Sequence, residues 1–185
     1  MKIWAISLCL LLLLTGCDPG SELERGMALR SAVLSAEKCR MDVHITADYG
    51  DFLSQFSLTC LFDNKGDLSF SVLHPESIEG IKGGISSSEG SIQFENTVLY
   101  FDLLADEQLS PISAPWILMK ALRSGYLKNA CIDGTDLLLT FEDSFEDDAL
   151  QVDIWLDSDN IPERAEILFR GYRILSMKLE NFQFL

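Results

Sequence analysis

Two segments near the start of the chain alternate apolar with polar residues, and this period of two constrains the fold more than any other feature. Residues 41–48 and 52–62 both show it, and Tyr49-Gly50 lies between them. Such alternation is typical of half-buried strands, which turn one face to a core and the other to water. The apolar positions are Met41, Val43, Ile45 and Ala47 in the first segment and Phe52, Phe56, Leu58, Cys60 and Phe62 in the second. The pattern therefore predicts an antiparallel hairpin with one apolar face.

The rest of the chain is dense in further strand and turn signals. Strand-like runs occur at residues 68–73, 78–86, 91–94, 97–103, 128–132, 135–142, 149–157, 163–170 and 172–184. Turn-forming residues separate many of them at intervals of about 8–12 residues, a spacing typical of antiparallel sheets and barrels. We therefore predict a mainly β (α+β) protein built on an antiparallel sheet or barrel.

Two segments carry helical signals instead. Residues 22–36 follow Ser21, a candidate N-cap, and place Leu23, Met27, Val33 and Leu34 near helical spacing. Residues 113–125 have Pro115 in the first turn and Gly125 at the end, as helices commonly do. Because this second segment is apolar almost all round, we expect it to be buried against the sheet.

The N-terminus has the pattern of a secretory signal. Lys2 precedes an apolar run from Ile3 to Leu14, which is shorter than the roughly 20 residues that a membrane-spanning helix needs. The run ends in Leu14-Thr15-Gly16-Cys17, which resembles the signal of bacterial lipoproteins, whose cysteine is lipidated before cleavage ahead of it. We expect a signal peptide at 1–16, a lipidated tether at 17–22 and a single domain at 23–185 on the extracytoplasmic face of the cell membrane. The alternative is an ordinary signal peptide with an incidental cysteine.

Cys39 and Cys60 are candidates for a disulfide, because an extracytoplasmic compartment permits one. If Tyr49-Gly50 forms a two-residue loop, Ala47 lies opposite Phe52 and Cys39 opposite Cys60. In this register the two cysteines occupy a non-hydrogen-bonded site of the hairpin. Cα atoms at such a site are about 4.5 Å apart, near the lower end of disulfide geometry. The alternative is that both cysteines are separate buried thiols. Cys131 is left over and is expected to be buried.

The charge and the histidines exclude several functions. Acidic residues outnumber basic ones by 29 to 14, and the net charge of −15 repels nucleic acid and anionic lipid headgroups. His44 and His74 lack the neighbours that a catalytic triad or a metal site requires, so we expect them to face solvent. We therefore predict no nucleic-acid partner, no catalytic residue, no metal site and no cofactor.

The C-terminal strands resemble those that close the fold of the LolA-like, or lipoprotein-localisation-factor-like, superfamily. The resemblance lies in VDIWLD at 152–157, IPERAEI at 161–167, RGYRIL at 170–175 and LENF at 179–182. DYGD at 48–51, PESIEGI at 75–81, LSP at 109–111 and SGY at 124–126 are similar to segments of uncharacterised lipoproteins of single-membrane bacteria. The resemblance implies an incomplete antiparallel β-barrel, a half-barrel with an N-terminal helix and one buried helix near 113–125. It also implies an apolar cavity, because members bind acyl chains or lipidated proteins, or act as sensors in envelope signalling.

Two hypotheses about function follow, and neither is an enzyme. The first is a membrane-anchored module whose concave sheet binds an apolar ligand such as an acyl chain or a lipidated protein. Its expected lining is Val43, Ile45, Phe52, Phe56 and Leu58 on the hairpin, with Trp116, Met119 and Leu122 on the buried helix. The alternative for these residues is that they pack against one another as a core. The second hypothesis is an interaction or sensory protein whose acidic convex face binds a protein partner at the cell envelope.

Overall fold

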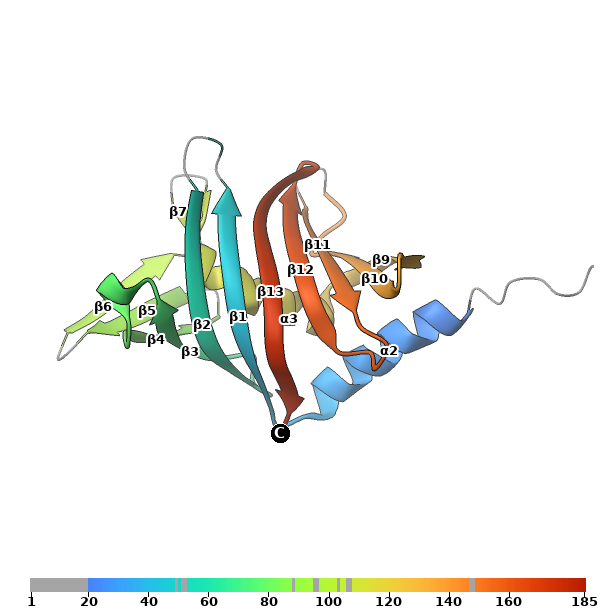
Figure 1. Ribbon diagram of the computed structural model, residues 1–185, viewed down its shortest axis with the longest axis horizontal. Coiled ribbons are helices and arrows are strands. Elements are labelled where there is room, and N and C mark those ends of the chain that lie inside the picture. Colours follow the sequence, from blue (N-terminus) through green and yellow to red (C-terminus); the bar gives the residue numbers. More distant parts are fainter. Residues whose placement is uncertain are drawn as a thin grey trace, which may run out of the picture.

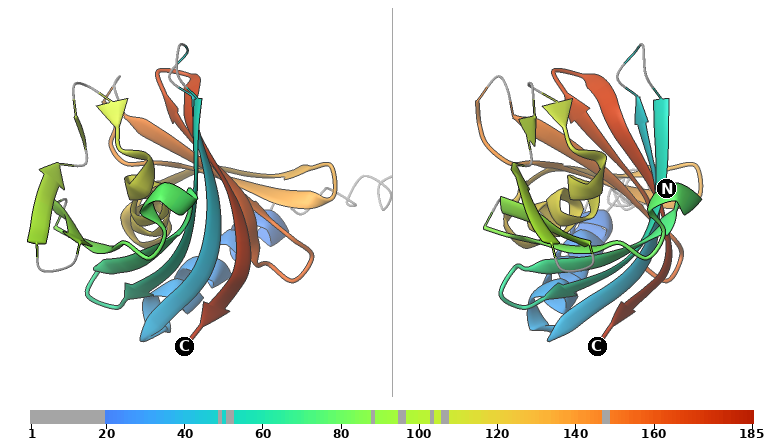
Figure 2. Two further views of the ribbon diagram at one scale, coloured as in Figure 1. Left: turned by 60° about the vertical axis from the view of Figure 1, so that its left-hand side comes forward. Right: turned by 90° about the vertical axis from the view of Figure 1, so that its left-hand side faces the viewer.

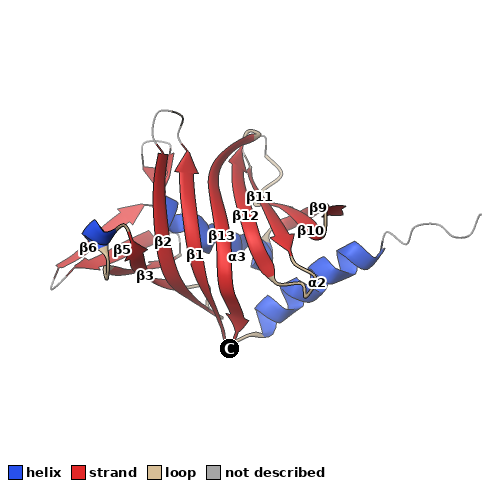
Figure 3. Cartoon of the chain, viewed as in Figure 1, coloured by secondary structure: helices blue, strands red, loops and turns tan. Residues whose placement is uncertain are grey.

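A single open sheet forms the body of the protein. The computed structural model describes residues 20–48, 50, 53–87, 89–94, 97–102, 104–105, 108–146 and 149–185. The predicted signal peptide, Cys17 and Phe52 lie outside these residues. Strands predominate throughout the described part, and two α-helices accompany them (Figure 3).

The elements follow one another along the chain with short connections. In order they are α2 (Gly20–Ser35), β1 (Lys38–Asp48), β2 (Leu53–Asp63), β3 (Leu68–His74), η1 (Glu76–Ile78), β4 (Lys82–Ser86), β5 (Glu89–Phe94), β6 (Thr97–Asp102), β7 (Leu104–Ala105), β8 (Gln108–Leu109), η2 (Pro111–Ser113), α3 (Ala114–Ser124), β9 (Tyr126–Asp133), β10 (Asp136–Glu142), β11 (Leu150–Leu156), β12 (Pro162–Phe169) and β13 (Tyr172–Phe184). The prediction of a strand at 78–86 was wrong for its first residues. Ile78 belongs to η1, and the strand β4 begins only at Lys82.

The main sheet has eleven antiparallel strands in the order β6-β5-β4-β3-β2-β1-β13-β12-β11-β10-β9 (Figure 1). Every neighbouring pair is consecutive in the chain except β1 and β13, which bring the first and last strands together at the middle of the sheet. The sheet is not closed, because β6 and β9 form its two edges. This architecture confirms the predicted fold class, a mainly β protein with an incomplete antiparallel barrel.

Helix α3 lies on the concave side of the sheet, which curls around it in the views of Figure 2. A sheet with one apolar face must cover that face, and here one almost wholly apolar helix does so. The buried residues of α3 are Ala114, Pro115, Trp116, Ile117, Leu118, Met119, Ala121 and Leu122. The prediction of a buried helix near 113–125 is therefore confirmed.

Helix α2 lies beside α3 and reaches the sheet at β9 and β10. It buries Gly26, Leu29 and Val33. A Cβ atom at Gly26 would lie 2.8 Å from a methyl carbon of Leu139 on β10, so glycine allows this close approach. The helix was expected at 22–36 but begins at Gly20, which places Ser21 inside the helix and not at its cap.

Arg30 joins α2 to the end of α3. Its guanidinium donates hydrogen bonds to the carbonyl oxygens of Leu122 (2.8 Å), Ala121 (3.3 Å) and Gly125. The last carbonyls of a helix have no partner within it and carry partial negative charge, so a cation there is favourable. Burial lowers the pKa of Arg30 from its ordinary value, yet an arginine remains charged in proteins.

The hairpin of β1 and β2 keeps its predicted faces but not its predicted register. Four residues, and not two, separate the strands, because β1 ends at Asp48. Cys39 therefore lies opposite Phe62, and Cys60 lies opposite Met41. A shift of two residues leaves every apolar side chain on the same face, so the apolar pattern could not reveal it.

The predicted disulfide between Cys39 and Cys60 is wrong for the same reason. The two residues are diagonal neighbours, which places them about 7–8 Å apart, whereas the Cα atoms of a bridged pair are usually about 4.4–6.8 Å apart. Cys39, Cys60 and Cys131 are free thiols, and Cys131 is only half-buried, contrary to expectation.

The contacts of Arg30 predict a large effect on stability. Replacing Arg30 with Met keeps the apolar stem but leaves three carbonyl oxygens without their charged donor, so the free energy of unfolding should fall by about 2–3 kcal/mol. Arg123→Met is the matched control, because Arg123 donates one exposed hydrogen bond, to the carbonyl of Asn64. Urea denaturation of both variants measures the difference. Equal losses would show that Arg30 does not hold the two helices together.

Candidate ligand-binding pocket

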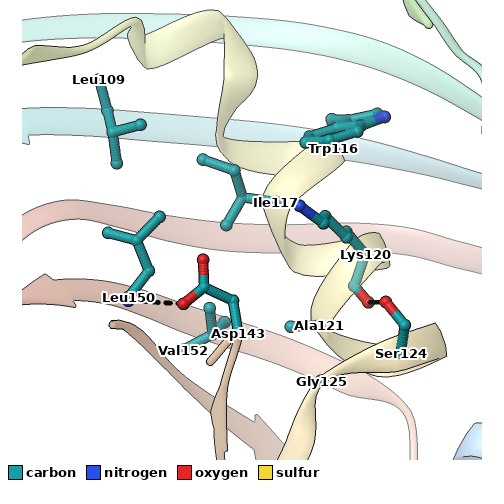
Figure 4. A pocket seen from close by; sticks show the side chains of 10 residues that line it. All are labelled: Leu109, Trp116, Ile117, Lys120, Ala121, Ser124, Gly125, Asp143, Leu150 and Val152. Atoms are coloured by element: carbon teal, nitrogen blue, oxygen red, sulfur yellow. Dashed lines mark hydrogen bonds between the residues drawn. The ribbon is translucent and has the colours of Figure 1, made fainter. Parts of the chain in front are cut away.

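A pocket of about 220 Å³ opens between α3 and β11 on the concave side of the sheet. It is lined by Leu109, Trp116, Ile117, Lys120, Ala121, Ser124, Gly125, Asp143, Leu150 and Val152 (Figure 4). Six of these residues come from α3 and the residue that follows it, two from β11, and one each from β8 and the loop after β10. The pocket is thus the part of the concave face that α3 leaves unfilled.

The walls of the pocket are apolar. Trp116, Ile117 and Ala121 are only 5–7% exposed, and Val152 faces them from the sheet with 1% exposed. Trp116 is held in place because its indole Nε1 donates a hydrogen bond to the carbonyl of Gly66, at 3.1 Å. These walls favour an apolar occupant over a polar one.

Polar groups lie at the rim. Lys120, Ser124 and Asp143 are exposed, and the ammonium of Lys120 lies 5.1 Å from the centre of the Trp116 ring. Asp143 Oδ1 accepts a hydrogen bond from the backbone N–H of Leu150 at 2.8 Å, and Ser124 donates one to the carbonyl of Lys120 at 3.0 Å (Figure 4). An apolar floor with a polar rim matches an amphiphile, whose polar end stays in water.

A tight turn at Gly125 ends α3 at the edge of the pocket. A Cβ atom at Gly125 would lie 2.7 Å from the carbonyl oxygen of Ala121, so only glycine allows the chain to turn so tightly. The N–H of Gly125 donates to that same carbonyl at 2.9 Å. Both residues line the pocket and both accept hydrogen bonds from Arg30, so α2 supports the pocket wall directly.

The volume restricts what the pocket can hold. Pockets that bury drug-sized ligands usually measure about 300–1,000 Å³. A space of about 220 Å³ accommodates a short apolar segment, such as part of an acyl chain, and not a whole lipid.

Most of the predicted lining lies elsewhere. Val43, Ile45, Leu58, Met119 and Leu122 are at most 1% exposed and belong to the packed core between the sheet and α3. Phe56 packs partly buried against that core. These residues therefore follow the alternative given in the sequence analysis, in which they pack against one another as a core.

Of the predicted lining residues that the structure describes, Trp116 lines the pocket. Sequence reasoning missed Ile117, Leu150 and Val152. A signal for the last two was available, because they alternate with polar residues at the start of a predicted strand. Nothing in the pattern showed that this strand lies beside the buried helix.

Other chemistry is scarce in the described part of the chain. No group of three or more His, Cys, Asp or Glu residues there could hold a metal ion. His44 is half-exposed on the convex face, where its Nδ1 lies 2.9 Å from the hydroxyl of Ser57, as expected of a solvent-facing histidine. Burial raises the pKa of the Cys60 thiol far above its ordinary value and raises that of Cys39 as well, so both are poor nucleophiles.

The convex face carries charges of both signs. Lys178 forms an ion pair with Glu180 at 2.8 Å, and Arg173 forms one with Glu166 at 3.0 Å. The hydrogen bond and the charge of Lys178 lower the pKa of Glu180 from its ordinary value. Around these pairs the face is therefore not the uniformly acidic surface that the second hypothesis assumed.

Comparison with known proteins concerns the fold. No protein-family model matches the sequence, and no curated protein matches it either. Several solved structures are similar, including an uncharacterized conserved protein from Thermus thermophilus (13% identity, TM-score 0.49, 86% of each chain covered). Others are a LolA superfamily protein from Nitrosomonas europaea (9%, 0.47, 86% of this chain and 93% of that one) and the lipoprotein LppX from Mycobacterium tuberculosis (11%, 0.43, 89% and 96%). The similarity extends over most of this chain, at 9–13% identity.

No helix in the described part of the chain is both long and apolar enough to cross a bilayer.

Proposed function

We propose that this chain is a lipid-anchored protein on the extracytoplasmic face of the cell membrane that binds a short apolar segment, such as part of an acyl chain. The observation that carries the proposal is the pocket between α3 and β11, with buried apolar walls and a polar rim. An acyl chain inserted there would replace water against Ile117 and Val152, and each methylene buried contributes about 0.8 kcal/mol. Its polar end would remain beside Lys120 and Asp143.

The anchor rests on the N-terminal sequence. The box Leu14-Thr15-Gly16-Cys17 ends only three residues before Gly20, the first residue of α2. A lipid on Cys17 would therefore keep the pocket close to a membrane, where acyl chains are concentrated.

Filling the pocket should weaken ligand binding. Ala121→Leu adds bulk to the wall at a 5% exposed position and should raise the Kd for cis-parinaric acid, a fluorescent fatty acid, about tenfold, a loss of about 1.4 kcal/mol. Fluorescence titration of the full chain measures this. Ala130→Leu is the control, because Ala130 packs partly buried against the core but does not line the pocket.

Thermal melting of both variants checks that they fold. If Ala121→Leu were unstable, Ile117→Ala would replace it, and the loss of its apolar wall should also weaken binding. Binding equal to that of the wild type in both pocket variants would rule out this pocket as the site.

Lipidation has a direct test at Cys17. Cys17→Ala should abolish incorporation of radiolabelled fatty acid in cells and block cleavage ahead of that position, because the thiol that receives the lipid is gone. Cys131→Ser is the control and should be processed normally. Labelling and cleavage unchanged in Cys17→Ala would show that the box is not a lipoprotein signal.

A second candidate function, binding of a protein partner, is favoured by the edge strand β6. Edge strands are usually protected by Lys or Pro, and β6, with the sequence TVLYFD, has neither. Val98, Leu99 and Tyr100 are 48%, 59% and 71% exposed, and Phe94 on the neighbouring strand is 55% exposed. Such an edge can accept an extended segment of another protein as an added strand.

Photocrosslinking in cells tests this candidate. A photoreactive residue in place of Leu99 should capture one defined protein, whereas the same residue in place of Ile132, 51% exposed on the other edge strand, should not. Capture of the same products at both positions would indicate nonspecific contact and would rule out a specific protein partner at β6.

A further inference from the structure

The solvent-facing side of α2 is unusually poor in charge. Its exposed residues are Ser21, Leu23, Glu24, Met27, Ala28, Ser31, Leu34 and Ser35. Only Glu24 is charged, although the chain has 29 acidic and 14 basic residues. A surface helix in water usually turns charged residues outward, so this side of α2 is not a typical solvated face.

An apolar stripe runs along that side. Leu23, Met27 and Leu34 are 49%, 47% and 50% exposed. At 3.6 residues per turn they project within about 40° of one another. Leu29 and Val33 project about 100° or more from the middle of this stripe, into the core, and buried Gly26 projects about 80° from it, so the stripe borders the buried face and extends its apolar surface toward solvent.

The stripe begins beside the proposed anchor. Gly20 is the third residue after Cys17, and three residues of extended chain span at most about 11 Å. The polar headgroup layer of a bilayer is roughly 5–8 Å thick on each side. A lipid on Cys17 therefore keeps the start of α2 within about 11 Å of the anchored residue, close to this layer.

Basic side chains gather at the other end of the stripe. A surface groove there is lined by Leu34 together with Lys65, Lys120 and Arg123. It contains one carboxylate, Asp67, which accepts a hydrogen bond from Ser86 at 2.6 Å. This local excess of positive charge in an acidic protein suits anionic headgroups, with about 1 kcal/mol for each basic residue near such a surface.

We propose that α2 lies in the plane of the membrane interface, with Leu23, Met27 and Leu34 in contact with the bilayer. The groove of Lys65, Lys120 and Arg123 then faces the lipid headgroups. The proposal rests on the lipid anchor of the proposed function. Arg30 on the same helix donates hydrogen bonds to Ala121 and Gly125, so the docked helix is in direct contact with two residues that line the pocket.

Depth-dependent fluorescence quenching tests this contact. The mature lipidated chain, which has lost Cys9 with the signal peptide and whose Cys17 thiol carries the lipid, is prepared in a Cys131→Ser background. It carries a single environment-sensitive label through Leu23→Cys or Met27→Cys and is reconstituted in vesicles of equal parts phosphatidylglycerol and phosphatidylethanolamine. Leu73→Cys and Val98→Cys are the controls, because their side chains are 47% and 48% exposed on β3 and β6, at the other end of the sheet from α2 (Figure 1). Buried Cys39 and Cys60 should not react with the label.

The expected result is quenching by nitroxide-bearing lipids at least threefold stronger at positions 23 and 27 than at 73 and 98. Adding Met27→Glu to the Leu23→Cys chain should reduce the quenching to the control level. Equal, weak quenching at all four positions would overturn the proposal. So would an apolar environment at 23 and 27 that nitroxide lipids do not quench, because protein and not lipid would then cover the stripe.

Fatty-acid analysis of Cys17 on the same samples separates the two proposals. Weak quenching in a lipidated chain refutes the docking of α2 and leaves the anchor intact. A chain that carries no lipid and does not stay with the vesicles refutes both.

Discussion

The rest of the structure depends on the burial of one face of one open sheet. Eleven antiparallel strands present a continuous apolar surface, and the second sheet in the described part of the chain is only the two-stranded pair of β7 and β8. Helix α3 provides much of the cover, with eight of its eleven residues buried, and α2 adds Leu29 and Val33. The helix is fixed at both ends, by the indole of Trp116 on the carbonyl of Gly66 and by the guanidinium of Arg30 on its last carbonyls. Removing either contact would weaken the attachment of the helix that covers the core.

The candidate site is a consequence of that arrangement. A helix is narrower than the curved sheet around it, so α3 cannot fill the concave face completely. The remaining space lies beside β11, where Leu150 and Val152 meet Ile117 across the pocket. Because Arg30 ties this end of α3 to α2, the pocket, the second helix and the proposed membrane surface are linked through adjoining residues.

Sequence reasoning predicted the positions of helices and strands better than the register between strands and the neighbours of each element. The alternation in β1 and the apolar, Pro- and Gly-bounded segment of α3 are local signals, and both elements are where they were predicted. The register of β1 and β2 was missed because a shift of two residues preserves every face, and loop length alone decides between the alternatives. The lining of the pocket was missed because it depends on which strand lies beside α3. Val152 and Val43 have the same local pattern and both belong to the core, yet Val152 also lines the pocket and Val43 does not.

The central claim is that an apolar segment binds between α3 and β11 while the core beneath α3 stays closed. Methyl NMR of the full chain, titrated with a medium-chain fatty acid, tests it most directly. The account predicts shifts of the methyl signals of Ile117, Leu150 and Val152, with those of Val43, Ile45 and Leu58 unchanged. Shifts centred on Val43, Ile45 and Leu58, or no shifts at all, would contradict it.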